Sequence, residues 1–169
     1  IGFLYAAWAA NFASWFILAN ARYQFPKLAW ELSIGPLAIG LIIGFVGLAE
    51  FLTFFFLRMS GRWHFRKLPL FGAQLLGAMG MVVMVLGKSE IPFALAFLLI
   101  GICCGTTYYS SLYYTVLLQK KKGRGTGLHE SIVGSGALLG PILGGVAAYF
   151  IGLRAPYALA FLVVVTAVG

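Results

Sequence analysis

The chain has 169 residues, of which 62% are hydrophobic and only 9% are charged, and this composition excludes an ordinary soluble domain. Its mean hydropathy of +0.97 is typical of proteins that cross a membrane several times. The formal net charge of +8 does not indicate nucleic-acid binding, because Lys and Arg stand in short clusters between hydrophobic segments and form no continuous basic face.

Six hydrophobic segments follow one another along the chain. They cover residues 2–20, 34–57, 68–87, 92–118, 126–151, and 156 to the end. A helix of about 20 apolar residues crosses a hydrocarbon layer of about 30 Å. The sequence therefore predicts an all-α membrane protein with six transmembrane helices.

The first segment carries a polar and aromatic face. Trp8, Asn11, Ser14 and Trp15 recur at three- and four-residue spacing, so they share one side of a helix. An amide near mid-membrane, such as that of Asn11, needs a partner on another helix, in water or on a solute. We interpret these four residues as candidates for lining a solute cavity. The alternative is hydrogen bonding between helices that holds the bundle together.

Glu50 is the one carboxylate well inside a hydrophobic segment. It stands eight residues before Arg58, roughly 12 Å in from that end of the helix at 1.5 Å per residue. A lone acid at that depth is expensive unless it is neutral, paired or in a water-filled cavity. Glu50 is therefore a candidate for proton coupling, and the alternative is a structural pair with another helix.

The fourth segment carries a run of hydroxyl groups between residues 106 and 115. So many hydroxyls cannot all face lipid, and we expect some to line a wet cavity. Tyr108, Tyr109 and Ser111 are the candidates for solute contact, whereas Tyr113 and Tyr114 fit an aromatic belt at the membrane interface. Hydroxyls beside aromatic faces suit sugars, nucleosides or amphipathic drugs.

The fifth segment opens with His129 and Glu130, directly after the basic stretch KKKGRGTG. An acid at a helix N-terminus is favoured by the helix dipole, so capping is one interpretation of Glu130. A gate built from His129, Glu130 and a basic partner is the other. An intramembrane enzyme with Ser135 as nucleophile is not favoured, because His129 stands six residues away on the same helix and does not face it.

The same segment has a glycine face. Gly136, Gly140 and Gly144 recur every fourth residue, with Gly145 beside the last. Such a face lets a second helix approach closely in lipid, and Pro141 removes one backbone hydrogen bond and bends the helix. The face indicates either a permanently tight helix pair or a bent helix that moves against another bundle.

A weak internal repeat links the second and fifth segments. The second segment has its own glycines at residues 35, 40, 44 and 47. Each group of three segments would have the opposite topology to the other, as in transporters with inverted repeats.

The basic residues indicate how the segments are oriented. One cluster follows the second segment (Arg58, Arg62, Arg66 and Lys67) and another follows the fourth (Lys120, Lys121, Lys122 and Arg124). The other three loops hold only Arg22, Lys27, Lys88 and Arg154. Lys and Arg accumulate in cytoplasmic loops, which predicts that both clusters and both chain ends face the cytoplasm.

No cofactor or metal site is expected. The adjacent Cys103 and Cys104 lie within a hydrophobic segment, cannot form a disulfide framework and lack the spacing of metal ligands. We interpret them as small packing residues.

Two motifs resemble the major facilitator superfamily of transporters. The stretch from Gly136 to Gly145 matches the GxxxGPxxGG pattern of that family, where it is best known from the fifth helix of drug/proton antiporters. The loop at 58–67 resembles the family's DRxGRR loop, with Gly61 and Arg62 at the GR positions, although Arg58 stands where the acid is expected. The topology places the glycine motif in the eleventh helix, so the antiporter activity does not carry over.

This resemblance implies a twelve-helix protein of two halves. Residues 1–169 would form the C-terminal half, a six-helix unit with a 3+3 inverted repeat, and the chain would be a piece of a longer transporter. The first and fourth segments would line the cavity, and the second and fifth would pack against the N-terminal half. The expected partners are a small solute, the lipid bilayer and that half, in a membrane of the bacterial inner type.

The function expected from sequence is transport of a small solute by alternating access, secondary active and with proton coupling as an option. A non-transporting membrane sensor of the same fold is the first alternative. The intramembrane enzyme is the second.

Overall fold

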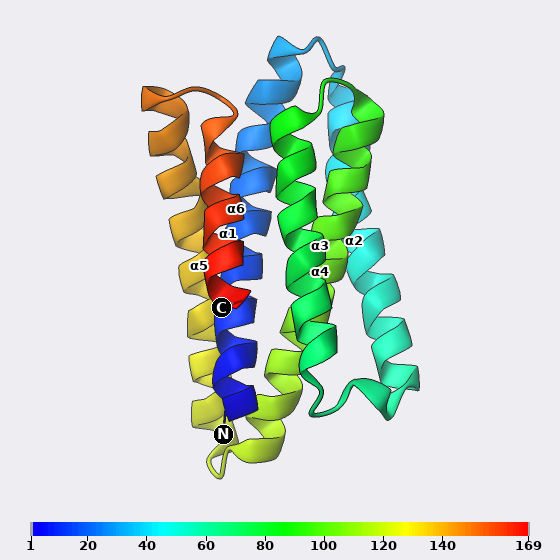
Figure 1. Ribbon diagram of the computed structural model, residues 1–169, viewed down its shortest axis with the longest axis vertical. Coiled ribbons are helices and arrows are strands. Elements are labelled where there is room, and N and C mark those ends of the chain that lie inside the picture. The colour runs from blue at the N-terminus through cyan, green and yellow to red at the C-terminus, as the bar shows by residue number, and fades with distance from the viewer. Residues whose placement is uncertain (1, 169) are drawn as a thin grey trace.

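The computed structural model describes residues 2–168 as helices joined by short turns (Figure 1). The elements are α1 (Gly2–Glu31), α2 (Pro36–Met59), the short 3-10 helix η1 (Gly61–Trp63), α3 (Lys67–Leu86), α4 (Glu90–Leu118), α5 (Lys122–Phe150) and α6 (Ala155–Val168). Helices α1 to α5 are long and apolar enough to cross a membrane, and α6 is shorter, with 14 residues. The predicted all-α fold with six helices is confirmed.

Helix α1 continues eleven residues beyond the predicted boundary at residue 20. Pro26 lies inside it and costs one backbone hydrogen bond. The surrounding turns are nevertheless held by burial, because the Phe25 ring packs against Phe93 and Phe97 of α4 with centroids 5.0 and 5.2 Å apart. Arg22 and Lys27, expected in a loop, therefore lie on a helix.

Helix α5 likewise begins four residues earlier than expected. Lys122 and Arg124, predicted in the fourth loop, lie in its first turns. Gly125 permits this early start, because its bare backbone packs on Gln119, whose Cβ would lie 3.0 Å from a Cβ at position 125.

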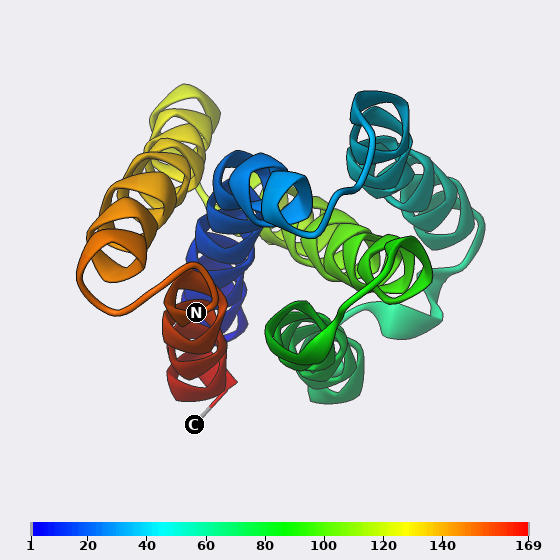
Figure 2. The same ribbon diagram turned by 90° about the horizontal axis from the view of Figure 1, so that it is seen from above.

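Seen from above, four helices stand in one row in the order α5, α1, α4, α2 (Figure 2). Helices α6 and α3 lie on one side of this row, where α6 packs on α1 and α3 packs on α4. The opposite side of the row is not covered by any helix within residues 2–168.

The helix contacts have the pattern of an inverted repeat. Exchanging α1, α2 and α3 with α4, α5 and α6 converts the α1–α5 contact into the α4–α2 contact. The same exchange converts α1–α6 into α4–α3 and leaves α1–α4 and α3–α6 unchanged, and all of these contacts are present. Because α1 and α4 run in opposite directions (Figure 1), the relation between the two groups is inverted.

The glycine face of α5 packs on α1. A Cβ at position 136 would lie 2.7 Å from the Phe12 carbonyl oxygen, and one at 144 would lie 2.9 Å from the Asn20 amide. A Cβ at Gly140 would collide with the Phe16 carbonyl oxygen. The two backbones approach so closely that no side chain fits between them.

The glycines of α2 do not take the equivalent place. A Cβ at Gly40, Gly44 or Gly47 would meet no atom within 4 Å. The α2–α4 contact instead uses a glycine of α4, since a Cβ at Gly101 would lie 2.7 Å from the Val46 carbonyl oxygen. These three glycines of α2 therefore do not serve close packing between helices within residues 2–168.

Both basic clusters lie at one end of the bundle, with the start of α1 (Figure 1). The turns α1–α2, α3–α4 and α5–α6 lie at the opposite end. There, the Arg154 guanidinium donates hydrogen bonds to the carbonyl oxygens of Val85 and Gly87, the latter at 2.8 Å. It thereby supplies donors to the end of α3, whose last carbonyls have no helical partner.

Candidate functional site

Two of the predicted polar residues on α1 bond directly to α4. The Trp8 Nε1 group donates to the Thr115 hydroxyl at 2.9 Å, and the Ser14 hydroxyl bonds to that of Thr107. Ser111, also a predicted candidate, is fully buried on α4. These contacts match the alternative in which polar groups hold helices together.

Asn11 belongs to a second arrangement, which connects α1, α5 and α4. Its Nδ2 lies 3.4 Å from Nε2 of His129, and His129 Nδ1 lies 3.1 Å from Oε1 of Glu130. The Tyr108 hydroxyl donates to the same Glu130 oxygen at 3.2 Å. With Asn11 donating to Nε2, the neutral imidazole carries its proton on Nδ1 and donates to Glu130.

This polar chain runs from the interior to the surface. His129 is fully buried, whereas the Glu130 side chain is 58% exposed. The predicted pair of His129 and Glu130 is thus joined by Asn11 and Tyr108, which were predicted separately as cavity residues. The buried imidazole is thus hydrogen-bonded to an accessible carboxylate, so neither polar group is isolated in lipid.

Tyr108 is also the centre of an aromatic group. Its ring centroid lies 4.9 Å from that of His129, 6.1 Å from Trp15 and 6.1 Å from Phe54. Helices α1, α2 and α5 therefore each contribute a side chain around this tyrosine of α4. We call Trp15, Phe54, Tyr108 and His129 the aromatic group.

Tyr109 takes a different place from its neighbour. Its ring packs 5.6 Å from Trp63 of η1, because adjacent residues on a helix point about 100° apart. Trp63 also donates its Nε1 proton to the Leu57 carbonyl at 3.0 Å. Tyr109, predicted to contact solute, thus packs on the α2–α3 turn and also lies 6.0 Å from the Phe54 ring.

The rest of that turn is fastened to α4 as well. His64 stacks on Tyr113 at 4.4 Å with the rings 8° from parallel, and the Phe65 amide donates to the Tyr114 hydroxyl at 2.8 Å. Phe65 adopts a φ of 53°, which a non-glycine residue rarely does without such support. The side chains of Arg58, Arg62, Arg66 and Lys67 point outward and are exposed.

Several buried polar atoms have no hydrogen-bond partner within residues 2–168. They are Asn11 Oδ1, Trp15 Nε1, Asn20 Oδ1, Gln74 Oε1, Ser110 Oγ, Ser111 Oγ and Tyr157 OH. Buried polar groups are normally hydrogen-bonded. An acceptor on Asn11 and a donor on Trp15, one turn apart on α1, are thus available to water or a solute.

Glu50 packs closely against α4, where a Cβ at Gly105 would lie 3.3 Å from its Cα. Its electrostatic neighbour is Arg22 of α1. Arg22, expected in a loop, lies seven residues after Trp15, which puts both residues on one side of the continued helix.

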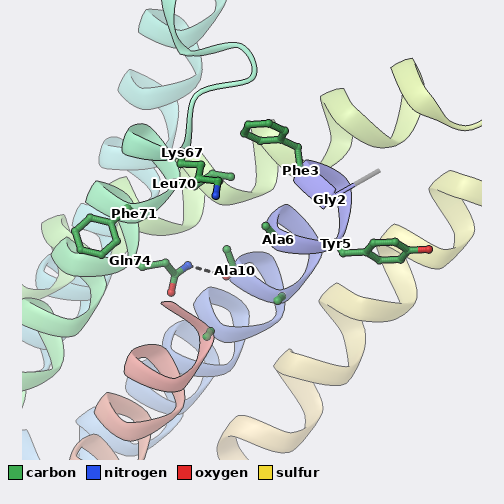
Figure 3. Close-up of a pocket in the computed structure, with 11 residues that line it drawn as sticks. Gly2, Phe3, Tyr5, Ala6, Ala10, Lys67, Leu70, Phe71 and Gln74 are labelled. Atoms are coloured by element: carbon green, nitrogen blue, oxygen red, sulfur yellow. Dashed lines mark hydrogen bonds between the residues drawn. The ribbon is translucent and has the colours of Figure 1, made fainter. Parts of the chain in front are cut away.

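A cavity lies elsewhere in the bundle (Figure 3). It measures about 630 Å³ and lies between α1, α3 and α6, lined mostly by apolar side chains such as Phe3, Leu70 and Phe71. Gln74, at its edge, donates to the Ala10 carbonyl at 2.9 Å. None of the predicted solute-contact residues lines this cavity.

The serine and the histidine of the enzyme alternative are not paired with each other. The Ser135 hydroxyl donates to the Ile132 carbonyl at 2.8 Å, while His129 is bonded to Asn11 and Glu130. The serine is therefore satisfied by its own helix and has no contact with the imidazole.

The lengths and apolar character of the helices and the inverted order of their contacts together define a helical membrane protein that crosses the bilayer several times. The sequence model of the Major Facilitator Superfamily matches residues 4–169, and the chain belongs to this superfamily. A search among curated proteins finds no matching sequence. The chain is thus an integral membrane protein of a transporter family, as its two motifs indicated.

Proposed function

We propose that this chain moves a small solute across a membrane by alternating access. The observation that carries the proposal is the polar chain through Asn11, His129, Glu130 and Tyr108, which joins α1, α5 and α4 and meets the aromatic group within the bundle. Polar groups inside a membrane are expensive and mark the path of a solute or ion.

A second six-helix half is the partner that the uncovered side of the row α5–α1–α4–α2 requires. Rocking of two such halves exposes a midplane site first to one side of the membrane and then to the other. The open glycines of α2 fit a surface on which another helix slides, because they leave its backbone accessible. The glycines of α5 fit a rigid pair with α1.

Secondary active transport coupled to protons is the version that these side chains favour. Glu50 and the His129–Glu130 pair both stand on the solute side, and each can change its protonation state there. Coupling requires that solute binding and protonation influence each other. The hydrogen bond from Tyr108 to Glu130 supports this, because it links a carboxylate to the aromatic group.

The proposed orientation follows from the basic clusters. The end that carries both clusters and the start of α1 lies in the cytoplasm. The short turns suit a bacterial inner membrane.

Transport is tested with the intact protein in proteoliposomes under an imposed pH gradient. Lumenal pH is followed while sugars, nucleosides, amino acids and cationic drugs are added in turn. We expect a solute-dependent proton flux that disappears in Glu50→Gln, while solute exchange without net proton movement survives. Glu90→Gln is the matched control, because Glu90 is an exposed acid in the first turn of α4.

Two outcomes would contradict the proposal in different ways. Solute binding without flux by a folded protein would favour the membrane sensor. Normal proton-driven uptake by Glu50→Gln would remove Glu50 from the coupling step and leave the His129–Glu130 pair, which His129→Gln then tests.

A further inference from the structure

Two residues of opposite charge, Arg22 on α1 and Glu50 on α2, lie on helix faces that also carry members of the aromatic group. Arg22 follows Trp15 by seven residues, about two turns, and so shares its face of α1. Glu50 precedes Phe54 by four residues, about one turn. Trp15 and Phe54 both contact Tyr108, so these two helix faces turn toward the same place.

Arg22 and Glu50 also lie at similar depth. Helices α1 and α2 run in opposite directions (Figure 1), which puts both residues on the same side of Tyr108, toward the α1–α2 turn. At 1.5 Å per residue, the Cα of Arg22 stands roughly 10 Å beyond Trp15, and that of Glu50 roughly 6 Å beyond Phe54.

A short stretch of α4 separates the two charges. Cys104 Sγ donates to the Ser14 carbonyl of α1 at 3.2 Å, and the next residue, Gly105, faces the Glu50 backbone on α2. The charges of Arg22 and Glu50 are close enough to influence each other, but they form no ion pair at 4 Å or less within residues 2–168.

Neither charge has a close partner within residues 2–168. The ion pair at 4 Å or less in that part of the chain joins His129 and Glu130, and no hydrogen bond there involves the guanidinium of Arg22, which is exposed. A guanidinium cannot shed its proton, so at this depth it needs a counter-charge.

The other titratable groups around Glu50 are a thiol and phenols. From α4 they are the thiol of Cys104 and the phenols of Tyr108 and Tyr109. Arg58 on α2 lies about two turns away toward the basic end, with Arg62 of η1 beyond it. Arg22 is thus the fixed charge to which Glu50 responds.

We propose that Arg22 binds an anionic group of the solute, a carboxylate or a phosphate, and that Glu50 is its alternative counter-charge. This inference rests on the proposed transport function. In the empty site the Glu50 carboxylate balances the guanidinium. When the solute anion occupies Arg22, Glu50 loses its counter-charge and takes one proton from water.

Charge is conserved in this exchange. The empty site holds one positive and one negative group, and the loaded site holds the guanidinium, the solute anion and a neutral acid. One anion and one proton therefore enter together. The planar guanidinium suits bidentate binding of an oxyanion, and Trp15 and Tyr108 offer aromatic surface to the remainder of the solute.

The pairing of the two residues is tested without any solute. Dicyclohexylcarbodiimide modifies carboxyl groups in their protonated form, and its attachment to Glu50 is quantified by peptide mass spectrometry on the intact protein at pH 7. We expect Arg22→Gln to raise this labelling several-fold, because Glu50 then lacks its counter-charge. Arg22→Lys keeps the charge and should label like the natural protein.

Lys27→Gln is the matched control, since Lys27 is an exposed cation on the same helix. The labelling of Glu50 in Lys27→Gln should equal that in the natural protein. Equal labelling of Glu50 in Arg22→Gln and in the natural protein would overturn the pairing.

Anion binding is tested by measuring Glu50 labelling in the presence of acetate or inorganic phosphate. Acetamide and glycerol are the neutral controls, and chloride keeps the ionic strength constant. At least one of the two anions should raise Glu50 labelling in the natural protein and not in Arg22→Gln, and which one acts distinguishes a carboxylate solute from a phosphate solute. If neither acts, the anion site is excluded. The part of this measurement made on the natural protein, with the anions against the neutral probes, stands even where Arg22→Gln does not fold.

Uptake separates this inference from the proposed function. Transport of a neutral solute by Arg22→Gln at the natural rate would keep the transporter and remove the anion site. Anion-dependent labelling in a protein that transports none of the solutes tested would keep the site and remove the transporter.

Discussion

At the scale of single residues, Arg154 closes one end of the bundle. Its guanidinium donates to carbonyls of Met84, Val85 and Gly87, at the end of α3. The residue belongs to the turn between α5 and α6, so one side chain joins the two three-helix groups. Hydrogen bonds from a charged donor contribute about 1.5–3 kcal/mol each when buried.

We therefore expect Arg154→Gln to lower the free energy of unfolding by about 2 kcal/mol. This is less than the sum over its hydrogen bonds, because Arg154 is only half-buried. Thermal unfolding of the intact protein in detergent measures this. Lys88→Gln, at an exposed cation of the same end, is the control and should change stability by less than about 0.5 kcal/mol. Equal melting temperatures of Arg154→Gln and Lys88→Gln would show that the contacts of Arg154 with α3 contribute nothing to stability.

At this scale the sequence predicted several residues of the site but not all of their contacts. Asn11, Tyr108, His129 and Glu130 were identified from residue type and spacing, and the fold connects them. The contact of Asn11 with His129 was not predictable, because no local pattern relates residues 118 positions apart. Arg22 was missed because a charge and a nearby proline suggest a loop until the burial of Phe25 is known.

At the scale of helices, the glycines of α5 and α2 differ in their surroundings. Gly140 faces the Phe16 carbonyl of α1, and Gly40 faces open space. A valine at 140 must push two helix backbones apart, whereas a valine at 40 meets nothing within residues 2–168.

We expect Gly140→Val to lower both stability and uptake, with a loss of stability on the order of 1–3 kcal/mol from overpacking. Gly40→Val should leave the bundle's stability unchanged and lower uptake, since we propose that a second half slides on this face. Thermal unfolding and uptake are measured on equal amounts of each protein. A stable and active Gly140→Val would contradict the contact with α1.

The number of helices was predictable, but the side that each presents to its neighbours was not. Hydropathy determines which stretches cross a membrane, and this gave six segments. In lipid the outer surface of a bundle is as apolar as its interior, so periodicity does not tell a covered glycine row from an open one. The same limit hid the role of Gly101, which packs on α2 while Gly44 does not.

At the scale of the whole molecule, the principal contacts cross between the two three-helix groups. Helix α1 packs on α5, α4 and α6, and α4 packs on α2 and α3. Within the first group, α1 has only minor contacts with α2 and α3. Neither group therefore has a core of its own.

We expect the chain cut between Lys88 and Ser89 to work only as two co-expressed pieces. Each piece alone should be degraded, because its helices lack their main partners, and the pair should co-purify. Recovery of each piece from membranes, alone and together, measures this. Isolation of a stable monomeric piece that spans α1 to α3 would contradict it.

The two cysteines offer a practical consequence. Cys103 and Cys104 are buried at the centre of the bundle, one against Gly77 and the other on the Ser14 carbonyl. A membrane-impermeant maleimide should therefore find no target within residues 2–168. Single cysteines introduced at Lys88 and at Lys121 would report which end of the bundle faces outward, with no need to remove the natural thiols first.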